Sequence, residues 1–233
     1  MPLPPGLESY EFARTLAPST DVGSLWHLRI QREEGGLPIL APEGKPPFTP
    51  ISAPDIFGRP GPIEIEIGCG KGNFLVDYAE RHPDLPILGI EKEPEIAFLA
   101  ARRLAKRPHV PHAKVLLGDA FHFFRDYLGD ASVSVFHMYF PDPWPKKRHH
   151  KNRLMGPDFM DQVRRTAVPD APFHWGTDHA DYNAEAQALF QSTDWLEIVN
   201  ADAPPTEGIM TNFEKKYRKQ GKPIYRCILR IKK

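Results

Sequence analysis

The chain has 233 residues, of which 41% are apolar, and its 30 basic and 30 acidic side chains give a formal net charge of zero. This length is enough for one large α/β domain with a buried core. No apolar run approaches the roughly 18 residues of a membrane-spanning helix, and residues 1–6 lack a basic segment followed by an apolar one, so we expect neither membrane insertion nor secretion.

The first part of the chain is rich in proline, with twelve of the 26 prolines in residues 1–62. Proline removes a backbone donor and interrupts regular structure. We therefore predict an irregular arm over residues 1–60, with a short strand in residues 24–31, and one folded domain over residues 61–233.

From residue 63 onward, segments typical of strands alternate with segments typical of helices. This alternation predicts a doubly wound, mostly parallel sheet. Pro94 suits the first turn of a helix, and Asn73 is a candidate helix cap. Strands are expected at 63–67, 87–90, 115–117, 133–140, 173–177, 195–199 and 224–231, with the last two as a possible hairpin, and helices at 73–81, 94–107, 120–127, 158–167 and 182–191.

Acidic residues stand at or just past the ends of four of these strands. Ligands of such sheets bind beyond the carboxyl ends of the strands, so the four acids predict one shared crevice. A single acid at such a position is also typical of a loop or a helix cap. The four residues are Glu91, Asp119, Asp142 and Asp178.

The loop after the first of these strands is Gly-x-Gly-x-Gly, formed by Gly68, Gly70 and Gly72. It lacks the sixth-position glycine of the dinucleotide fingerprint, and the chain has no Walker loop. Glu66 would repel a pyrophosphate but attract a cation, and Glu91 can accept both hydroxyls of a ribose. A ligand with adenosine, a sulfonium and no phosphate fits this loop, which indicates S-adenosylmethionine.

Residues 139–153 carry the most specific pattern. Pro141, Pro143, Pro145 and Trp144 surround Asp142, and five cations follow by residue 153. A second basic cluster, residues 211–233, has nine Lys/Arg and one Glu. Either cluster alone is typical of a solvated face, but together they favour a localised polyanion site. The two cysteines, Cys69 and Cys227, have no metal-type spacing, so we expect reduced thiols, no metal and a cytoplasmic protein.

Over about residues 60–233 the chain resembles the tRNA (guanine-N7-)-methyltransferase family. The resemblance rests on the glycine loop with Glu66, on Gly89–Glu91, on Gly118–Ala120, on Phe140–His149, on Thr177-Asp178 and on Thr211–Glu214. It implies a Rossmann-like class I methyltransferase with a seven-stranded, doubly wound sheet and a C-terminal antiparallel strand. It also implies transfer of a methyl group from S-adenosylmethionine to N7 of a guanine at position 46, in the tRNA variable loop.

The resemblance further implies roles for individual residues. Asp142 would be catalytic, either by electrostatic stabilisation or by positioning the cofactor. Cofactor contacts would be Glu66, Gly68, Gly70, Gly72, Glu91, Asp119 and Asp142. Substrate contacts would be Lys146, Asp178, Thr211, Asn212, Phe213 and Glu214. The cations expected on the RNA backbone are Lys147, Arg148, Lys151 and Arg153.

Guanine N7 has a lone pair and no proton, so the expected reaction requires alignment rather than a general base. We expect a monomer or homodimer that binds tRNA and no membrane, without an obligate protein partner. Two alternatives stay open. One is a methyltransferase of the same fold with a different substrate, and the other is an RNA-binding protein that retains a relic of the cofactor pocket.

Overall fold

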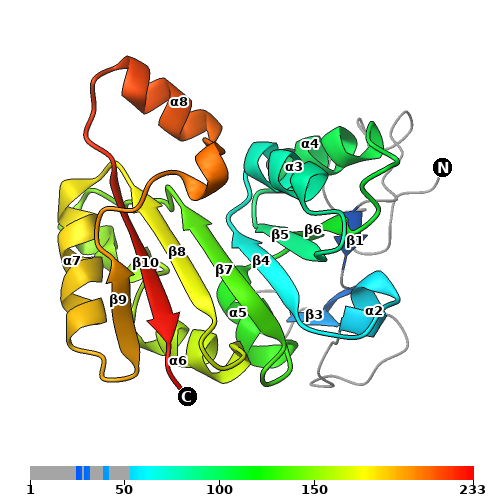
Figure 1. Cartoon of the computed structure of the whole chain (residues 1–233), viewed down its shortest axis with the longest axis horizontal. Coiled ribbons are helices and arrows are strands. Elements are labelled where there is room, and N and C mark those ends of the chain that lie inside the picture. The colour runs from blue at the N-terminus through cyan, green and yellow to red at the C-terminus, as the bar shows by residue number, and fades with distance from the viewer. Residues whose placement is uncertain (1–24, 28, 32–38, 42–52) are drawn as a thin grey trace. The chain divides into compact units, whose positions relative to one another are not determined.

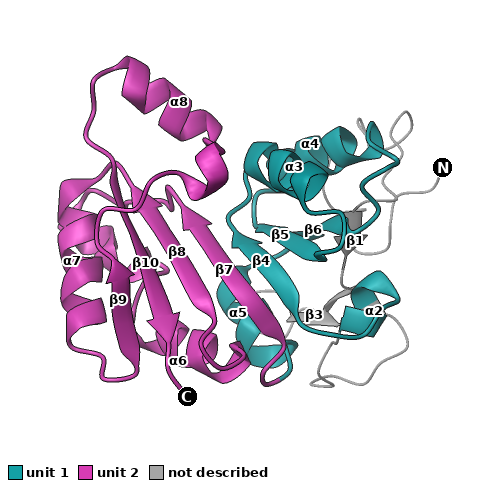
Figure 2. Ribbon diagram, in the orientation of Figure 1, with its two compact units in different colours: residues 1–129 teal, residues 130–233 magenta. Residues whose placement is uncertain are grey.

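The computed structural model describes residues 25–27, 29–31, 39–41 and 53–233. The chain divides into two compact units, residues 1–129 and residues 130–233 (Figure 2). Most of the arm predicted over residues 1–60 lies outside the described residues. Within it, the short strand expected at 24–31 corresponds to β1 (Leu25–His27) and β2 (Arg29–Gln31), and β2 pairs antiparallel with β3 (Ile39–Ala41).

The first unit contains a parallel array in the order β1, β6, β5, β4 (Figure 1). All five residues of β4 are buried, including Glu64 and Glu66, as is usual for parallel strands covered on both faces. The elements beyond residue 52 are α2 (Ala53–Phe57), β4 (Ile63–Ile67), α3 (Asn73–Arg81), β5 (Ile87–Glu91), α4 (Pro94–Ala105), β6 (Ala113–Leu117) and α5 (Ala120–Asp126).

Helices α3 and α4 pack against these strands through their apolar sides. Pro94 begins α4, as predicted, because its fixed φ suits the first helical turn. The expectation that Asn73 caps α3 was wrong. Gly72 is the N-cap, in a left-handed conformation, and Asn73 is the first helical residue.

The second unit contains strands in the order β7, β8, β10, β9. Strands β7 and β8 run parallel, whereas β10 runs antiparallel to both of its neighbours. Trp175 of β8 packs edge-on against Tyr182 and Phe190 of α7. The elements are β7 (Val133–Tyr139), η2 (Lys147–Asn152), α6 (Pro157–Thr166), β8 (Pro172–Thr177), α7 (Ala180–Gln191), β9 (Leu196–Asn200), η3 (Thr206–Gly208), α8 (Asn212–Lys219) and β10 (Tyr225–Ile231).

Seven strands follow residue 60, with helices between them and an antiparallel last strand, as the predicted fold class requires. The single domain expected over residues 61–233 stays a prediction, and its residues fall in both units. Among the described residues, no helix is both long and apolar enough to span a membrane.

Candidate active site

The glycine loop of the first unit turns the chain sharply from β4 into α3. The amides of Gly68 and Cys69 both donate to the carbonyl of Ile90, at 2.8 and 2.9 Å. Gly72 has φ +68°, and a Cβ at this position would lie 3.0 Å from the Cβ of Ala100 in α4. Only glycine combines this backbone conformation with such a close approach, so the loop is held tightly against its neighbours.

Glu91, at the end of β5, fixes this loop. One of its oxygens accepts from the amide of Gly70 at 3.0 Å, and the other accepts from the amide of Glu93 at 2.9 Å. Burial raises the pKa of Glu91, and these backbone hydrogen bonds offset part of that effect. A carboxylate has about four lone-pair positions, so Glu91 keeps the capacity to accept from the hydroxyls of a ribose.

Glu66 is buried in β4 behind the same loop. Burial raises the pKa of its carboxyl well above the ordinary range, and the nearby charge of Glu91 raises it further. Its Oε2 atom is buried and has no hydrogen-bond partner among the residues that the structure describes. Buried polar atoms are nearly always paired, so this oxygen fits a bound donor or cation.

Cys69 and Asp119 complete the first unit's part of the site. Burial raises the pKa of the Cys69 thiol well above its usual value, and the charges of Glu66 and Glu91 add to this. Cys69 is therefore a neutral packing side chain, and both cysteines are free thiols. Asp119 is the N-cap of α5, where it accepts from the amide of His122 at 3.0 Å. Its side chain is still 43% exposed.

In the second unit, the Pro-Asp-Pro-Trp loop follows β7 in an unusual backbone conformation. Phe140 and Trp144 both have positive φ, 54° and 43°, which is uncommon outside glycine and requires support from neighbouring contacts. The amide of Phe140 donates to the carbonyl of Gly176 at 2.7 Å. Asp142 lies between these two residues and is exposed.

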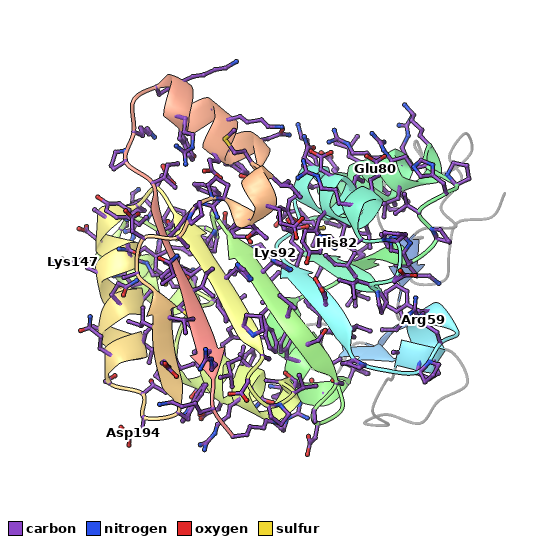
Figure 3. The ribbon with its side chains drawn as sticks, viewed as in Figure 1. Arg59, Glu80, His82, Lys92, Lys147 and Asp194 are labelled. Carbon is purple, nitrogen blue, oxygen red and sulfur yellow. The ribbon has the colours of Figure 1, made fainter. Side chains whose placement is uncertain are left out.

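The basic run after this loop forms η2. Lys146, Lys147, Arg148 and Lys151 are exposed, and Lys147 lies at the outer surface of the second unit in Figure 3. Arg153 differs from them, because its side chain is only 2% exposed and its guanidinium contacts protein groups. The role expected for Arg153 as a phosphate contact therefore has to be revised.

Helix α8 carries the residues expected to contact the substrate, and Figure 1 shows it beyond the end of β8 that leads to Asp178. Thr211 is its N-cap and accepts from the amide of Glu214 at 3.1 Å. Phe213 is 50% exposed. Its ring lies near those of Tyr217 and Phe140, at centroid distances of 6.0 and 6.3 Å.

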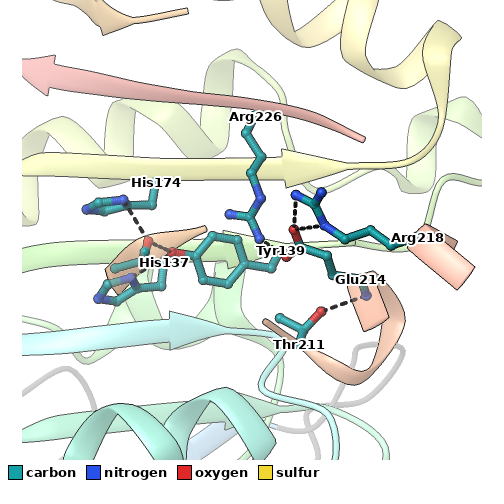
Figure 4. A network of polar contacts seen from close by, with 8 residues as sticks. His137, Tyr139, His174, Thr211, Glu214, Arg218 and Arg226 are labelled. Atoms are coloured by element: carbon teal, nitrogen blue, oxygen red, sulfur yellow. Dashed lines mark hydrogen bonds and ion pairs between the residues drawn. The ribbon is translucent and has the colours of Figure 1, made fainter. Parts of the chain in front are cut away.

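Glu214 is fully buried, and two arginines already contact its carboxylate (Figure 4). Arg218 donates to Oε1 at 2.8 and 2.9 Å, and Arg226 of β10 pairs with Oε2. The guanidinium of Arg226 also lies 4.9 Å from the centre of the Tyr139 ring. Glu214 therefore anchors α8 to the sheet, and direct contact with a guanine would require displacement of an arginine.

The same network continues toward η3. The hydroxyls of Tyr139 and Thr206 lie 2.6 Å apart, and ring nitrogens of His137 and His174 contact them at 3.1 and 3.2 Å. Burial lowers the pKa of His174 to about 3, with contributions from His137 and Arg226. The segment that leads to Thr211 is thus fixed by buried polar contacts that the sequence did not suggest.

Comparisons with known proteins define the class of this chain. Residues 60–227 match a family model described as "Putative methyltransferase". The solved structure of the 16S rRNA methyltransferase KamB is similar, with a TM-score of 0.54 and 12% identity, over 76% of this chain and 91% of that one. At this identity the likeness concerns the fold alone. The fold and the family model together make this chain a class I methyltransferase.

Two bacterial relatives narrow the assignment, and both are named tRNA (guanine-N(7)-)-methyltransferase. The protein of Halalkalibacterium halodurans is 35% identical over 178 residues, which cover 73% of this chain and 79% of that protein. The protein of Thermotoga maritima is 31% identical over 191 residues, or 82% of this chain, and the match spans 60% of that protein's length. The chain belongs to the tRNA (guanine-N(7)-)-methyltransferase family. The predicted family and fold class are confirmed, and the roles of single residues stay predictions.

Proposed function

We propose that this chain transfers the methyl group of S-adenosylmethionine to N7 of a guanine at position 46, in the tRNA variable loop. The observation that carries the proposal is the buried Oε2 of Glu66, which has no partner among the described residues and lies beside a glycine loop held by Glu91. Such a pair of carboxyls favours a cationic ligand over a phosphorylated one. A cytoplasmic location and a monomeric or dimeric state stay predictions.

The cofactor would be held mainly by the first unit. Glu91 would accept from the ribose hydroxyls, and Asp119 would accept from the adenine amino group. Gly68, Gly70 and Gly72 would let the backbone approach the ligand closely. When bound, S-adenosylmethionine supplies an electrophilic methyl group on a positively charged sulfur, and the carboxyl of Glu66 would stabilise the positive charge of the ligand.

Asp142 is the proposed catalytic residue. Bound S-adenosylmethionine would supply the methyl group to N7, and the imidazole ring of guanine would then carry the positive charge. No residue needs to remove a proton. A fixed carboxylate near this ring would stabilise the developing charge, or it would act only by positioning the cofactor.

The second unit would hold the tRNA. Exposed cations of the basic run, Lys146, Lys147, Arg148 and Lys151, would contact phosphates without reading sequence. Asp178, Thr211 and Asn212 would contact the guanosine. Phe213 presents an exposed ring on a basic helix, and a base stacked on it would gain about 1–3 kcal/mol. Glu214 would act through its ion pairs, by holding these residues in place.

The proposal is tested by incubating the chain with unmodified tRNA and radiolabelled cofactor, followed by nuclease digestion. The expected labelled nucleoside is 7-methylguanosine. Asp142→Ala and the isosteric Asp142→Asn should lose most of the turnover while their far-ultraviolet circular dichroism is unchanged. A labelled nucleoside other than 7-methylguanosine would refute the proposed reaction, and turnover near wild type in both variants would remove Asp142 from it.

A further inference from the structure

Arg153 is the last cation of the basic run, yet it does not face solvent. Its side chain is 2% exposed, whereas Lys146, Lys147, Arg148 and Lys151 are all exposed. A buried guanidinium is stable only when hydrogen bonds and an opposite charge offset its lost hydration. The residues that Arg153 contacts therefore indicate its role.

These partners come from the Pro-Asp-Pro-Trp loop and from α7. The Nε atom of Arg153 donates to the carbonyl of Pro143 at 2.7 Å, and one of its terminal nitrogens pairs with Glu185. The guanidinium lies 4.6 Å from the ring centre of Tyr182, whose hydroxyl accepts from the amide of Met155 at 3.0 Å. One side chain thus links the loop, the end of η2 and a helix.

The Pro143 carbonyl that Arg153 contacts lies directly before Trp144 in the loop. It belongs to the peptide unit between Pro143 and Trp144, and Trp144 has the positive φ of 43°. A residue in this conformation costs of order 1–3 kcal/mol unless its surroundings support it. A charge-assisted hydrogen bond to the preceding carbonyl is such support, and Asp142 is the residue immediately before Pro143.

We propose that Arg153, held by Glu185 and Tyr182, is a positioning residue that fixes the Pro143–Trp144 peptide and thereby the direction of the Asp142 carboxylate. Arg153 then acts through the loop and not as an exposed phosphate contact of the basic run, and its Nη2 atom has no hydrogen-bond partner among the described residues. The proposal rests on the proposed function, in which Asp142 stabilises the charge that develops on the guanine or positions the cofactor. Lysine cannot replace Arg153, because one ammonium lacks the planar fork that reaches the carbonyl and Glu185 together while lying on a ring.

The test compares Arg153→Lys and Arg153→Met with two matched variants. Lys151→Ala removes an exposed cation from the same run. Arg165→Met removes an arginine that pairs with Asp130 at the surface of the same unit, at 2.6 Å. For each variant we would measure kcat and KM for tRNA, the salt dependence of tRNA binding, and the midpoint of thermal unfolding.

We expect both Arg153 variants to lower kcat on the order of 10- to 100-fold, as misplacement of a reacting group by about 1 Å does. Their KM for tRNA and the slope of log Kd against log salt should equal those of the wild type. Lys151→Ala should instead reduce that slope by about 1, and Arg165→Met should match the wild type in every measurement except for a small loss of thermal stability.

If the Arg153 variants do not fold, Glu185→Ala tests the same contact, because its side chain is half exposed and alanine is favourable in a helix. It should lower kcat several-fold and leave the salt slope unchanged. A reduced salt slope with wild-type kcat in either set of variants would overturn the proposal. Absence of 7-methylguanosine with the wild-type chain would instead overturn the proposed function, so the two failures are distinguishable.

Discussion

Among the candidate site residues, the environment of Glu66 says most about the charge of a ligand. Its carboxyl is buried, and the nearby charge of Glu91 raises its pKa further. One of its oxygens has no hydrogen-bond partner among the described residues. Both effects favour the protonated form of the carboxyl. A bound cation would favour the ionised form, so cofactor binding and proton release should be linked at this residue.

This linkage predicts a measurable proton release. When S-adenosylmethionine binds at a pH at which the Glu66 carboxyl of the free chain is protonated, the raised pKa of Glu66 should fall and protons should leave the protein. Calorimetric titrations in two buffers of different ionisation enthalpy would then give different binding enthalpies. The difference should shrink in Glu66→Gln and with S-adenosylhomocysteine, which lacks the sulfonium charge. Equal enthalpies in both buffers for the wild type would contradict the assignment.

Helix α8 is attached to the sheet near its N-terminus. The helix starts with Thr-x-x-Glu, which is the sequence signature of a capping box. Thr211 does cap the helix, but Glu214 turns its carboxylate to Arg218 and Arg226 instead. The attachment of α8 therefore depends on a buried ion pair with β10.

Removal of one partner from this ion pair should strongly lower the free energy of unfolding. We expect Arg226→Met to lower the free energy of unfolding by roughly 3–5 kcal/mol, because it leaves the Glu214 charge buried and poorly compensated. Arg218→Met should lower it by less than about 1 kcal/mol, since Arg218 is 49% exposed. Urea unfolding would measure both, and the Glu214→Met/Arg226→Met pair should recover part of the loss. Equal effects of the two single arginine substitutions would contradict this view of the pair.

The histidine network next to this helix should make stability depend on pH. His174 has a pKa of about 3 in the folded chain, far below its ordinary value, so the unfolded chain binds a proton that the folded chain does not. Its contribution is present above about pH 6.5 and is lost as the pH falls toward 3, by about 2 kcal/mol between pH 7 and pH 5.

His174→Gln retains hydrogen-bonding capacity toward Thr206 without this titration. The difference in unfolding free energy between wild type and variant should therefore shrink by about that amount from pH 7 to pH 5. The remaining histidines, including His137, are common to both proteins. A difference that is independent of pH would show that His174 is protonated in the folded chain.

The elements themselves were largely predictable, because periodicity, Gly72 and Pro94 act locally. The sequence did not allow us to predict which cations are buried. Arg153 stands among exposed lysines, and it is buried by contacts with Tyr182, with Glu185, 32 positions later, and with the Pro143 carbonyl. Arg226 likewise lies in an ordinary strand pattern until Glu214 is placed beside it. A run of cations in sequence does not say which members are solvated, since their partners are tertiary.

The candidate site residues are divided between the two units of the whole chain. The glycine loop with Glu66, Glu91 and Asp119 belongs to residues 1–129, whereas both basic clusters and Asp142 belong to residues 130–233. A formal net charge of zero therefore conceals acidic residues proposed to bind a cation in one unit and basic clusters proposed to bind an anion in the other. An enzyme that uses a sulfonium donor and a polyanionic acceptor would require both kinds of residue.

The most direct test of the account replaces a single atom of the acceptor. A tRNA with 7-deazaguanosine at position 46 keeps the shape and charge of the substrate but has a carbon–hydrogen group in place of the N7 lone pair. We predict about one methyl group transferred to each tRNA that has guanosine at this position, and none to the deaza form, although both should bind equally well. Equal methylation of the two would contradict transfer to N7.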